Sequence, residues 1–280
     1  MPKHIREGLQ RIEREFSLAN KRLSLAITDL KEALWQPIWW HLAWQEIRQR
    51  YRRSLIGPFW ITISTGIMIA AMGPLYGRLF EQPLGPYFQH LAIGLVVWVF
   101  ISGYLNEVGF AFVSAEGFIK DVKIPYSTYV FKVLVKHLIM FLHNFVIVLT
   151  VLLFFPPRTL ATVPMVLPGL IVMLLNLLWI GTALAILCVR FRDIAQIVGS
   201  VVQLLFFLTP IMWQVEMLGE RRELAEWNVI YHLIQIVRSP LVGETPNLLS
   251  WIVTCGMAVV GGAVALCLFA RFRSRISYWI

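Results

Sequence analysis

Long apolar runs, separated by short polar stretches, fill most of the chain after residue 58. About 20 residues rising about 1.5 Å each cover the roughly 30 Å hydrocarbon core of a bilayer, and every run is about that long or longer. The pattern therefore predicts an all-α membrane protein, with one transmembrane domain over 59–280. The six predicted transmembrane helices are Phe59–Phe80, Phe88–Val113, Ser127–Phe155, Val163–Val189, Ile194–Trp213 and Trp251–Ala270.

The first 35 residues are polar overall but carry apolar residues at steps of three and four, such as Ile5, Leu9, Ile12 and Phe16. This spacing puts the apolar side chains on one face of a helix. We expect residues 1–35 to form an amphipathic cytoplasmic extension. It either rests on the membrane or on its own protein, or it docks on a cytoplasmic partner subunit.

Residues 36–58 combine tryptophans with a cluster of arginines close to the first predicted span. Tryptophan favours the headgroup level of a bilayer, and arginine can keep its stem in apolar surroundings while its guanidinium reaches a phosphate. We therefore expect an interfacial helix in the inner leaflet, ended by Gly57-Pro58, where the chain turns into the bilayer. The arginines of this segment are Arg48, Arg50, Arg52 and Arg53.

Two loops between predicted spans have patterns of their own. Ser114–Tyr126 is short and charged, and it predicts one or two helical turns that are either a plain connector or a contact for a soluble motor. Residues 214–250 are unusually apolar for an exposed loop but are interrupted by Pro240, Gly243 and Pro246. They favour a periplasmic re-entrant hairpin between the fifth and sixth spans, because backbone at membrane depth must be buried in protein or line a water-filled cavity.

Composition and charge placement support a membrane protein with both termini in the cytoplasm. The chain is 58% hydrophobic and 15% charged, against about 45–50% and about 25% in soluble domains. The net charge of +9 would suit a nucleic-acid partner, but 20 of the 25 lysines and arginines fall on the side that holds the termini. Such a bias marks the cytoplasmic face. We expect a multi-pass protein of the bacterial inner membrane, in contact with membrane lipids and with no nucleic acid.

The sequence lacks the motifs of common catalytic sites. It has no G-x-x-x-x-G-K-[ST] phosphate loop, no G-x-S-x-G and no H-E-x-x-H, so it has no visible means of hydrolysing ATP. Cys188, Cys255 and Cys267 stand apart in apolar surroundings and predict neither a disulfide nor a metal site. We expect no catalytic residue, no metal and no bound cofactor.

Charged residues are scarce inside the apolar runs, and Glu107 is the clearest of them. Proton-coupled carriers mark their pathways with such residues. Glu107 lies near the end of the second predicted span, and two interpretations are open. It pairs with a basic neighbour such as Lys132 or Lys136, or it has a role in coupling or substrate binding.

Aromatic and methionine side chains are abundant in the first and fifth predicted spans. Each of them, taken alone, suits contact with lipid or with a neighbouring helix. If two such faces met across a dimer, they would line a conduit in which sugar rings stack on aromatics without strong binding. The candidate channel residues are Phe59, Trp60, Met68, Met72, Tyr76, Phe206, Phe207 and Trp213.

Several motifs occur together in an order that resembles one family. They are Tyr51–Trp60 (YRRSLIGPFW), Lys120–Pro125 (KDVKIP), Val189–Ile194 (VRFRDI), Thr209-Pro210-Ile211 and the segment from Asn228 to Arg238. This series is similar to that of ABC-2 type polysaccharide-export permeases over about residues 36–275. Thr209 replaces a usual serine, and Val229 replaces a proline, so the geometry of the periplasmic hairpin is less closely defined by the resemblance.

The resemblance implies a homodimer that works with two copies of a separate nucleotide-binding ATPase and exports an undecaprenyl-linked polysaccharide, O antigen above all. Ser114–Tyr126 would be the coupling helix, with Glu116, Lys120, Asp121 and Lys123 facing the ATPase. The arginines of 36–58 would receive the lipid pyrophosphate, or would only fix topology and contact headgroups. The alternatives are a capsule or teichoic acid exporter, an exporter of a smaller lipid or drug, and a membrane-embedded transferase.

Overall fold

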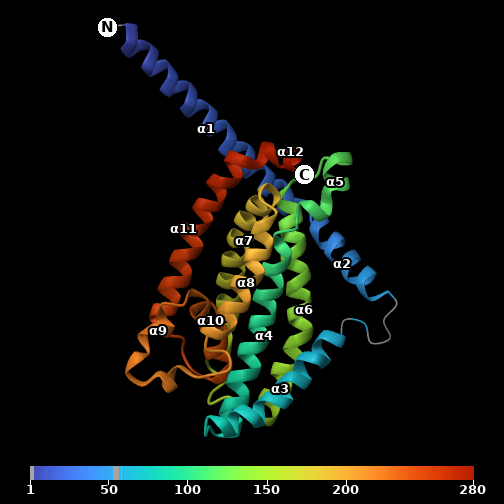
Figure 1. The fold of residues 1–280 in the computed structure, drawn as a ribbon, viewed down its shortest axis with the longest axis vertical. Coiled ribbons are helices and arrows are strands. Elements are labelled where there is room, and N and C mark those ends of the chain that lie inside the picture. The colour runs from blue at the N-terminus through green and yellow to red at the C-terminus, as the bar shows by residue number, and fades with distance from the viewer. Residues whose placement is uncertain (1–2, 53–56, 58) are drawn as a thin grey trace.

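A computed structural model of the chain describes residues 3–52, 57 and 59–280, with side chains from residue 16 onward. Within these ranges the fold is all-helical and contains no strand (Figure 1). The α-helices are α1 (Lys3–Trp35), α2 (Ile38–Tyr51), α3 (Phe59–Leu79), α4 (Leu84–Val108), α5 (Glu116–Asp121), α6 (Ser127–Phe154), α7 (Val166–Arg190), α8 (Asp193–Leu208), α9 (Glu223–Glu226), α10 (Val229–Val242), α11 (Leu248–Phe272) and α12 (Ile276–Trp279). Short 3₁₀ helices precede α5, α7, α9 and α12.

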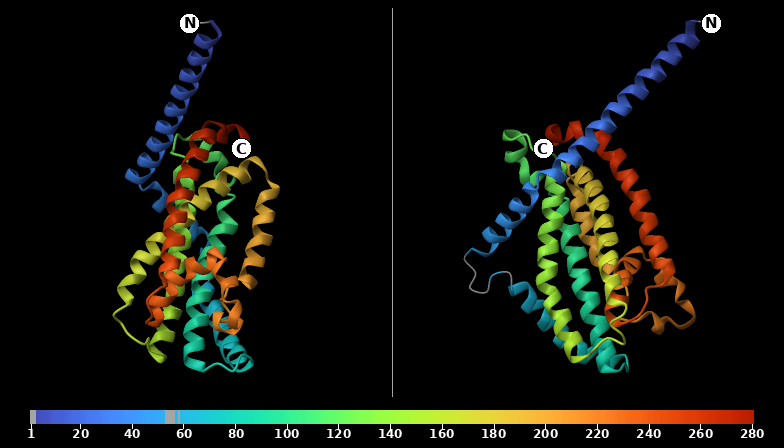
Figure 2. Two further views of the ribbon diagram at one scale, coloured as in Figure 1. Left: turned by 90° about the vertical axis from the view of Figure 1, so that its left-hand side faces the viewer. Right: turned by 180° about the vertical axis from the view of Figure 1, so that it is seen from behind.

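Helix α4 lies at the centre of the bundle. It packs against α3, α6, α7, α8 and α10, and its side chains from Leu91 to Val97 are almost completely buried. Helix α11 packs against α7 on one flank, and α8 stands on another flank, as the two further views show (Figure 2). Contact with five neighbouring helices explains the long apolar run of α4.

Five helical segments of the described chain are long and apolar enough to cross a membrane. They are Phe59–Leu79, Leu84–Val108, Ser127–Phe154, Val163–Arg190 and Leu248–Trp279. The predicted span Ile194–Trp213 forms α8, which ends at Leu208 after 16 residues. At about 1.5 Å per residue this helix covers about 24 Å, less than the hydrocarbon core.

The chain leaves α8 at Thr209, whose backbone is extended with φ −91° and ψ 135°. Pro210 follows, and a proline disfavours the helical conformation of the residue before it. Beyond the break, the 3₁₀ helix Val215–Arg221 and α9 lead into α10, which lies among α4, α7 and α11 and has most of its side chains buried. The apolar character of 214–250 is therefore explained by packing inside the bundle.

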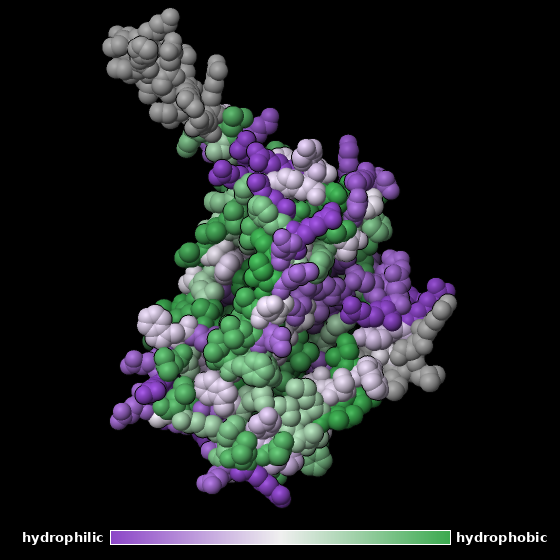
Figure 3. Space-filling model, in the orientation of Figure 1, coloured by the Kyte–Doolittle hydropathy of each residue, from purple (hydrophilic) through white to green (hydrophobic). Residues whose placement is uncertain are grey.

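The second half of α1 packs on α11 and α6, whereas its first half projects away from the bundle (Figure 1). Ala26, Asp29 and Ala33 are buried in this contact. Their spacing of three and four residues places them on one face of α1. Hydrophilic residues gather at this end of the molecule, around α5 and α12, while the lower part of the surface is mostly hydrophobic (Figure 3).

Candidate functional site

A groove of about 400 Å³ lies over α4, between α3 and α8. Helix α4 contributes Leu95, Trp98, Val99, Ser102 and Asn106, α3 contributes Met68, and α8 contributes Gly199, Val202, Gln203, Phe206 and Phe207. Both flanking helices expose most of their side chains, and Val202 is the single buried residue of α8. The groove is therefore open on the side away from α4.

Three aromatic rings line this groove, beside the apolar side chains of Met68, Leu95, Val99 and Val202. The ring centroids of Trp98 and Phe206 lie 5.7 Å apart, and those of Phe206 and Phe207 lie 5.4 Å apart. Ser102, Asn106 and Gln203 add polar atoms along the same surface. Aromatic faces with a few hydrogen-bonding groups suit the apolar faces and hydroxyls of sugar rings, and such contacts can be weak and repeated.

The structure brings three of the eight candidate channel residues, Met68, Phe206 and Phe207, into this groove. Trp213 lies beyond the end of α8 and donates from Nε1 to the Phe207 carbonyl at 3.2 Å. The remaining four lie on α3 outside the groove. Phe59 meets the ring of His143 edge-on, Tyr76 stacks on Phe80, Trp60 is exposed, and Met72 is half-buried.

The groove residues Trp98, Ser102 and Asn106 were not among the predicted site residues. They follow one another at steps of four along α4, which places them on one helix face. A tryptophan, a serine and an asparagine sharing one face of an otherwise apolar span is the signal that would have found them.

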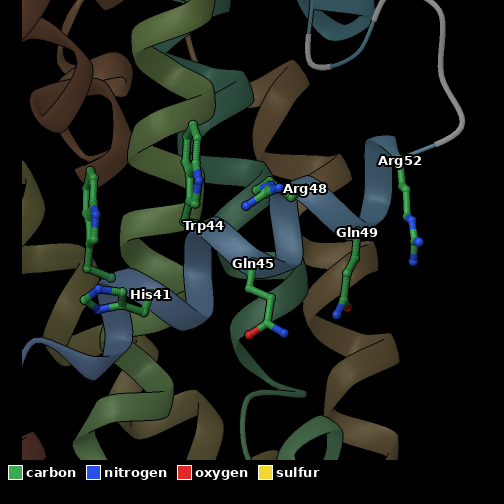
Figure 4. Close-up of a pocket in the computed structure, with 7 residues that line it drawn as sticks. His41, Trp44, Gln45, Arg48, Gln49 and Arg52 are labelled. Carbon is green, nitrogen blue, oxygen red and sulfur yellow. The ribbon is translucent and has the colours of Figure 1, made fainter.

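Helix α2 presents a second surface, a cavity of about 600 Å³ lined by Trp40, His41, Trp44, Gln45, Arg48, Gln49 and Arg52 (Figure 4). Arg48 and Arg52 are one turn apart on it and both are exposed. Arg50 is also exposed but does not line this cavity. Arg53 lies outside the described residues. Two of the four predicted arginines therefore share a face with tryptophans, an arrangement that fits a phosphate at the level of lipid headgroups.

Helix α5 is the short helix expected between the second and third predicted spans. Its Glu116 and Lys120 form an ion pair of 2.5 Å on the exposed surface, and hydrogen bonding to Lys120 lowers the pKa of Glu116. Asp121 and Lys123 are exposed as well. Phe118 and Val122 expose about half of their side-chain surface at 53% and 48%. Two exposed apolar side chains therefore lie among the charged residues of this segment.

A cluster of charged residues joins α2, α4 and α6. Lys136, 1% exposed, contacts Glu107 and donates to Glu46 at 2.5 Å. His137 lies 2.9 Å from the other oxygen of Glu107, and Lys132 lies 2.8 Å from Glu46. Glu107 is thus paired, as one of the two sequence interpretations expected, and its lysine is Lys136. Glu46 was missed, since no local pattern links residues 90 positions apart.

The cluster borders a cavity of about 320 Å³ that reaches α5. Glu46, Glu107 and Lys132 line it together with Phe118 and Tyr129. Helix α2, the short helix α5 and the long helices α4 and α6 therefore line one cavity.

At the opposite end of the bundle, α10 and its N-cap residue form hydrogen bonds with the residues at which α8 ends. Asn228 caps α10 by accepting from Ile230 N at 2.9 Å, and its Nδ2 donates to Thr209 Oγ1 at 2.9 Å. Arg238, 4% exposed, donates to the Pro210 carbonyl at 2.8 Å. Thr209 thus supplies the hydroxyl that a serine would supply. Val229 begins α10 at the position where the family usually has proline.

The described helices define a multi-pass membrane protein. A model of the family described as ABC-2 type transporter matches residues 38–242. The O-antigen export system permease protein RfbA of Myxococcus xanthus is 24% identical over 179 residues, which cover 61% of this chain and 66% of that protein. The chain therefore spans just under two thirds of the length of this curated relative.

The chain belongs to the ABC-2 type transporter family. Members of this family are transport subunits that work with ATP-binding partners. The family match begins at the first residue of α2 and ends at the last residue of α10. It includes the groove, the arginine face of α2, the charged cluster and α5, and it leaves α1 and α11 outside.

Proposed function

We propose that this chain is the transmembrane subunit of an ATP-driven exporter that moves an undecaprenyl-linked polysaccharide, O antigen in the first place, across the bacterial inner membrane. The observation that carries the proposal is the open aromatic groove over α4. The name of the Myxococcus relative supports the class of cargo.

The groove is half of a conduit, and a second copy of the chain would close it. On α8, Ile197, Val201, Leu204 and Phe207 expose between 46% and 64% of their surface. Exposed apolar surface on the two helices that flank a groove fits a symmetric interface with the same groove of a second protomer. The transporter is then a homodimer with two ATPase subunits, one for each α5.

In this proposal α8 and the residues from Thr209 to Gln214 form the sixth crossing. The helix covers about 24 Å, and the chain turns directly after Thr209, where Ile211 N donates to the Thr209 carbonyl at 2.7 Å. The crossing is therefore short, and a bilayer accommodates a short apolar segment by thinning locally. The arrangement places both termini in the cytoplasm and makes the 3₁₀ helix Val215–Arg221, α9 and α10 the periplasmic re-entrant element.

The surfaces at the cytoplasmic end then have complementary roles. Arg48 and Arg52 receive the pyrophosphate of the lipid carrier at the inner leaflet, where guanidinium groups match phosphate oxygens. Helix α5 seats on the ATPase, and the charged cluster around Lys136 transmits its movement to α2 and α4. ATP is bound by the partner, and this chain holds no cofactor.

The proposal is tested by placing a photo-crosslinking amino acid at Phe206 and, as a matched control, at Leu153, which is 80% exposed on α6. Illumination of cells that make the glycan is expected to attach glycan to position 206 and not to 153. A Trp98→Ala variant is expected to lower surface glycan at unchanged protein level, with Leu153→Ala as control. Attachment of a small lipid at position 206 would assign a different cargo. Equal glycan labelling at both positions would refute the groove as the path of the glycan.

A further inference from the structure

A further cavity, with a distinct chemistry, lies where α1 meets the end of α11. Its volume is about 430 Å³, and it is lined by Arg22 and Leu23 of α1, by Cys267, Ala270 and Arg271 of α11, and by Arg275 just beyond α11. None of its lining residues is acidic. Three arginines from two distant parts of the chain therefore line one cavity.

These three arginines have no carboxylate partner in the described part of the chain. Arg273 lies between Arg271 and Arg275 in sequence, but it donates to Asp29 and so stabilises the packing of α1. Arg22, Arg271 and Arg275 are exposed and form no ion pair with a described residue. Arg271 also lies over the ring of Phe272, with its guanidinium carbon 5.6 Å from the ring centroid. Unpaired arginines at one cavity give it a positive charge that attracts an anion.

An apolar lane leads away from the arginines along α11. Val260, Val264, Cys267 and Arg271 follow at steps of four, three and four, which places them on one face of the helix. Val260 and Val264 are 65% and 53% exposed, and Cys267 is exposed too. The lane faces away from the protein and ends at the guanidinium group of Arg271.

The depth of the cavity matches the headgroup region. Leu248–Trp279 is one of the segments long enough to span a bilayer, and about 20 of its residues cover the hydrocarbon core. A crossing that begins near Leu248 leaves the core about one turn before Arg271. The guanidinium groups then lie at the level of phosphates, and the lane lies at the level of acyl chains.

We propose that this cavity binds an anionic phospholipid from the leaflet on the α5 side of the bundle. Its phosphate lies among Arg22, Arg271 and Arg275, and one acyl chain follows Val264 and Val260. The bound lipid joins α1 to α11 and stabilises the docked half of α1. Basic pockets between helices at a membrane surface have the charge and shape for such headgroups. The site does not depend on the identity of the exported cargo.

The test uses the purified full-length chain, delipidated in detergent, with phosphatidylglycerol or phosphatidylcholine added. Native mass spectrometry counts retained lipids, and thermal unfolding gives Tm. Phosphatidylglycerol is expected to be retained and to raise Tm, whereas phosphatidylcholine does neither. The variant R22Q/R271Q/R275Q is expected to lose retention at least tenfold. The control R78Q/R221Q/R222Q, which removes three exposed arginines elsewhere, is expected to retain the lipid.

Two further arms keep the proposal falsifiable. R22K/R271K/R275K keeps the charge and is expected to retain phosphatidylglycerol, and R271Q alone replaces the triple variant if that variant fails to fold. Water-soluble glycerophosphoglycerol is expected to leave Tm unchanged, because it has no acyl chain for the lane. Equal retention of both lipids, full retention by R22Q/R271Q/R275Q, or a full Tm shift with glycerophosphoglycerol would each overturn the proposal.

Discussion

The carboxylate of Asp29, on α1, accepts a hydrogen bond from Arg273 Nε at 2.7 Å across 244 positions of the chain. The same carboxylate accepts from Ser127 N at 3.0 Å and from Ser127 Oγ at 2.7 Å, at the start of α6. The buried carboxylate of Asp29 therefore connects α1 with the end of α11 and with the start of α6. This contact is the polar centre of the interface on which α1 rests.

We expect Asp29→Ala to destabilise the chain by about 3 kcal/mol, because removing one partner of a buried ion pair leaves the other groups unpaired. Denaturant unfolding in detergent measures the change. Glu32→Ala, an exposed acidic residue one turn further along α1, is the control and is expected to change stability by less than about 0.5 kcal/mol. Equal effects of the two substitutions would contradict the role of Asp29.

The pH dependence of stability is expected to report the pairing of α2 with α6. Burial by itself raises the pKa of Glu46, but hydrogen bonds and charges from Lys132 and Lys136 outweigh burial and hold that pKa below its usual range. A depressed carboxyl pKa contributes stability above the unfolded value of about 4.3, and the contribution is lost as pH falls through the folded value.

The measurement compares the wild type with Glu46→Gln across the acid range. The stability difference is expected to be constant above about pH 5.5 and to shrink as the pH falls below the ordinary carboxyl range. Glu116→Gln removes an exposed carboxylate on α5 and is the control, expected to differ little from the wild type at any pH. A Glu46→Gln difference that grows on acidification would show that the sign of the pKa shift is wrong.

Asn228 has two roles that substitution can separate. Its side-chain oxygen caps α10, and its Nδ2 donates to Thr209 at the end of α8. Asn228→Asp keeps the cap and loses the donor, whereas Asn228→Ala loses both. We expect Asn228→Ala to cost about 1 kcal/mol more than Asn228→Asp in thermal or denaturant unfolding. Identical losses would assign the whole effect to the Thr209 contact.

Much of the fold follows from hydropathy, since contact with lipid and burial in the bundle both select apolar residues. The long helices α3, α6, α7 and α11 were predicted to within about three residues at each end, and the short helix α5 was predicted in its loop. The helix predicted over Phe88–Val113 lies earlier in the chain, at Leu84–Val108, because the chain leaves α4 at Gly109 although the apolar residues continue. The end of α8 was predicted too late, because Ile211, Met212 and Trp213 continue the apolar run beyond Pro210. Hydropathy averaged along the chain does not detect that a single proline ends the helix.

The candidate site was predicted only in part, for a related reason. Helical spacing reports which residues share a face, but not which neighbouring helix the face meets. Met68 and Phe206 lie in the groove, whereas Tyr76 stacks on Phe80 within its own helix and the following turn. Glu46 and Asp29 find partners about 90 to 244 positions away. Such contacts are set by tertiary packing and leave no periodic signal.

Coupling to the ATPase is expected to depend on the exposed apolar side chains of α5. Phe118 is 53% exposed, so Phe118→Asp should fold normally. A charge in the centre of an apolar contact costs binding, and we expect affinity for the ATPase to fall at least tenfold, about 1.4 kcal/mol. Leu224→Asp, 64% exposed on α9 at the opposite end of the bundle, is the matched control (Figure 1).

Co-purification and stimulated ATP hydrolysis are measured for both variants. Full association of the Phe118→Asp chain would place the ATPase on another surface, and equal losses in both variants would point to general unfolding.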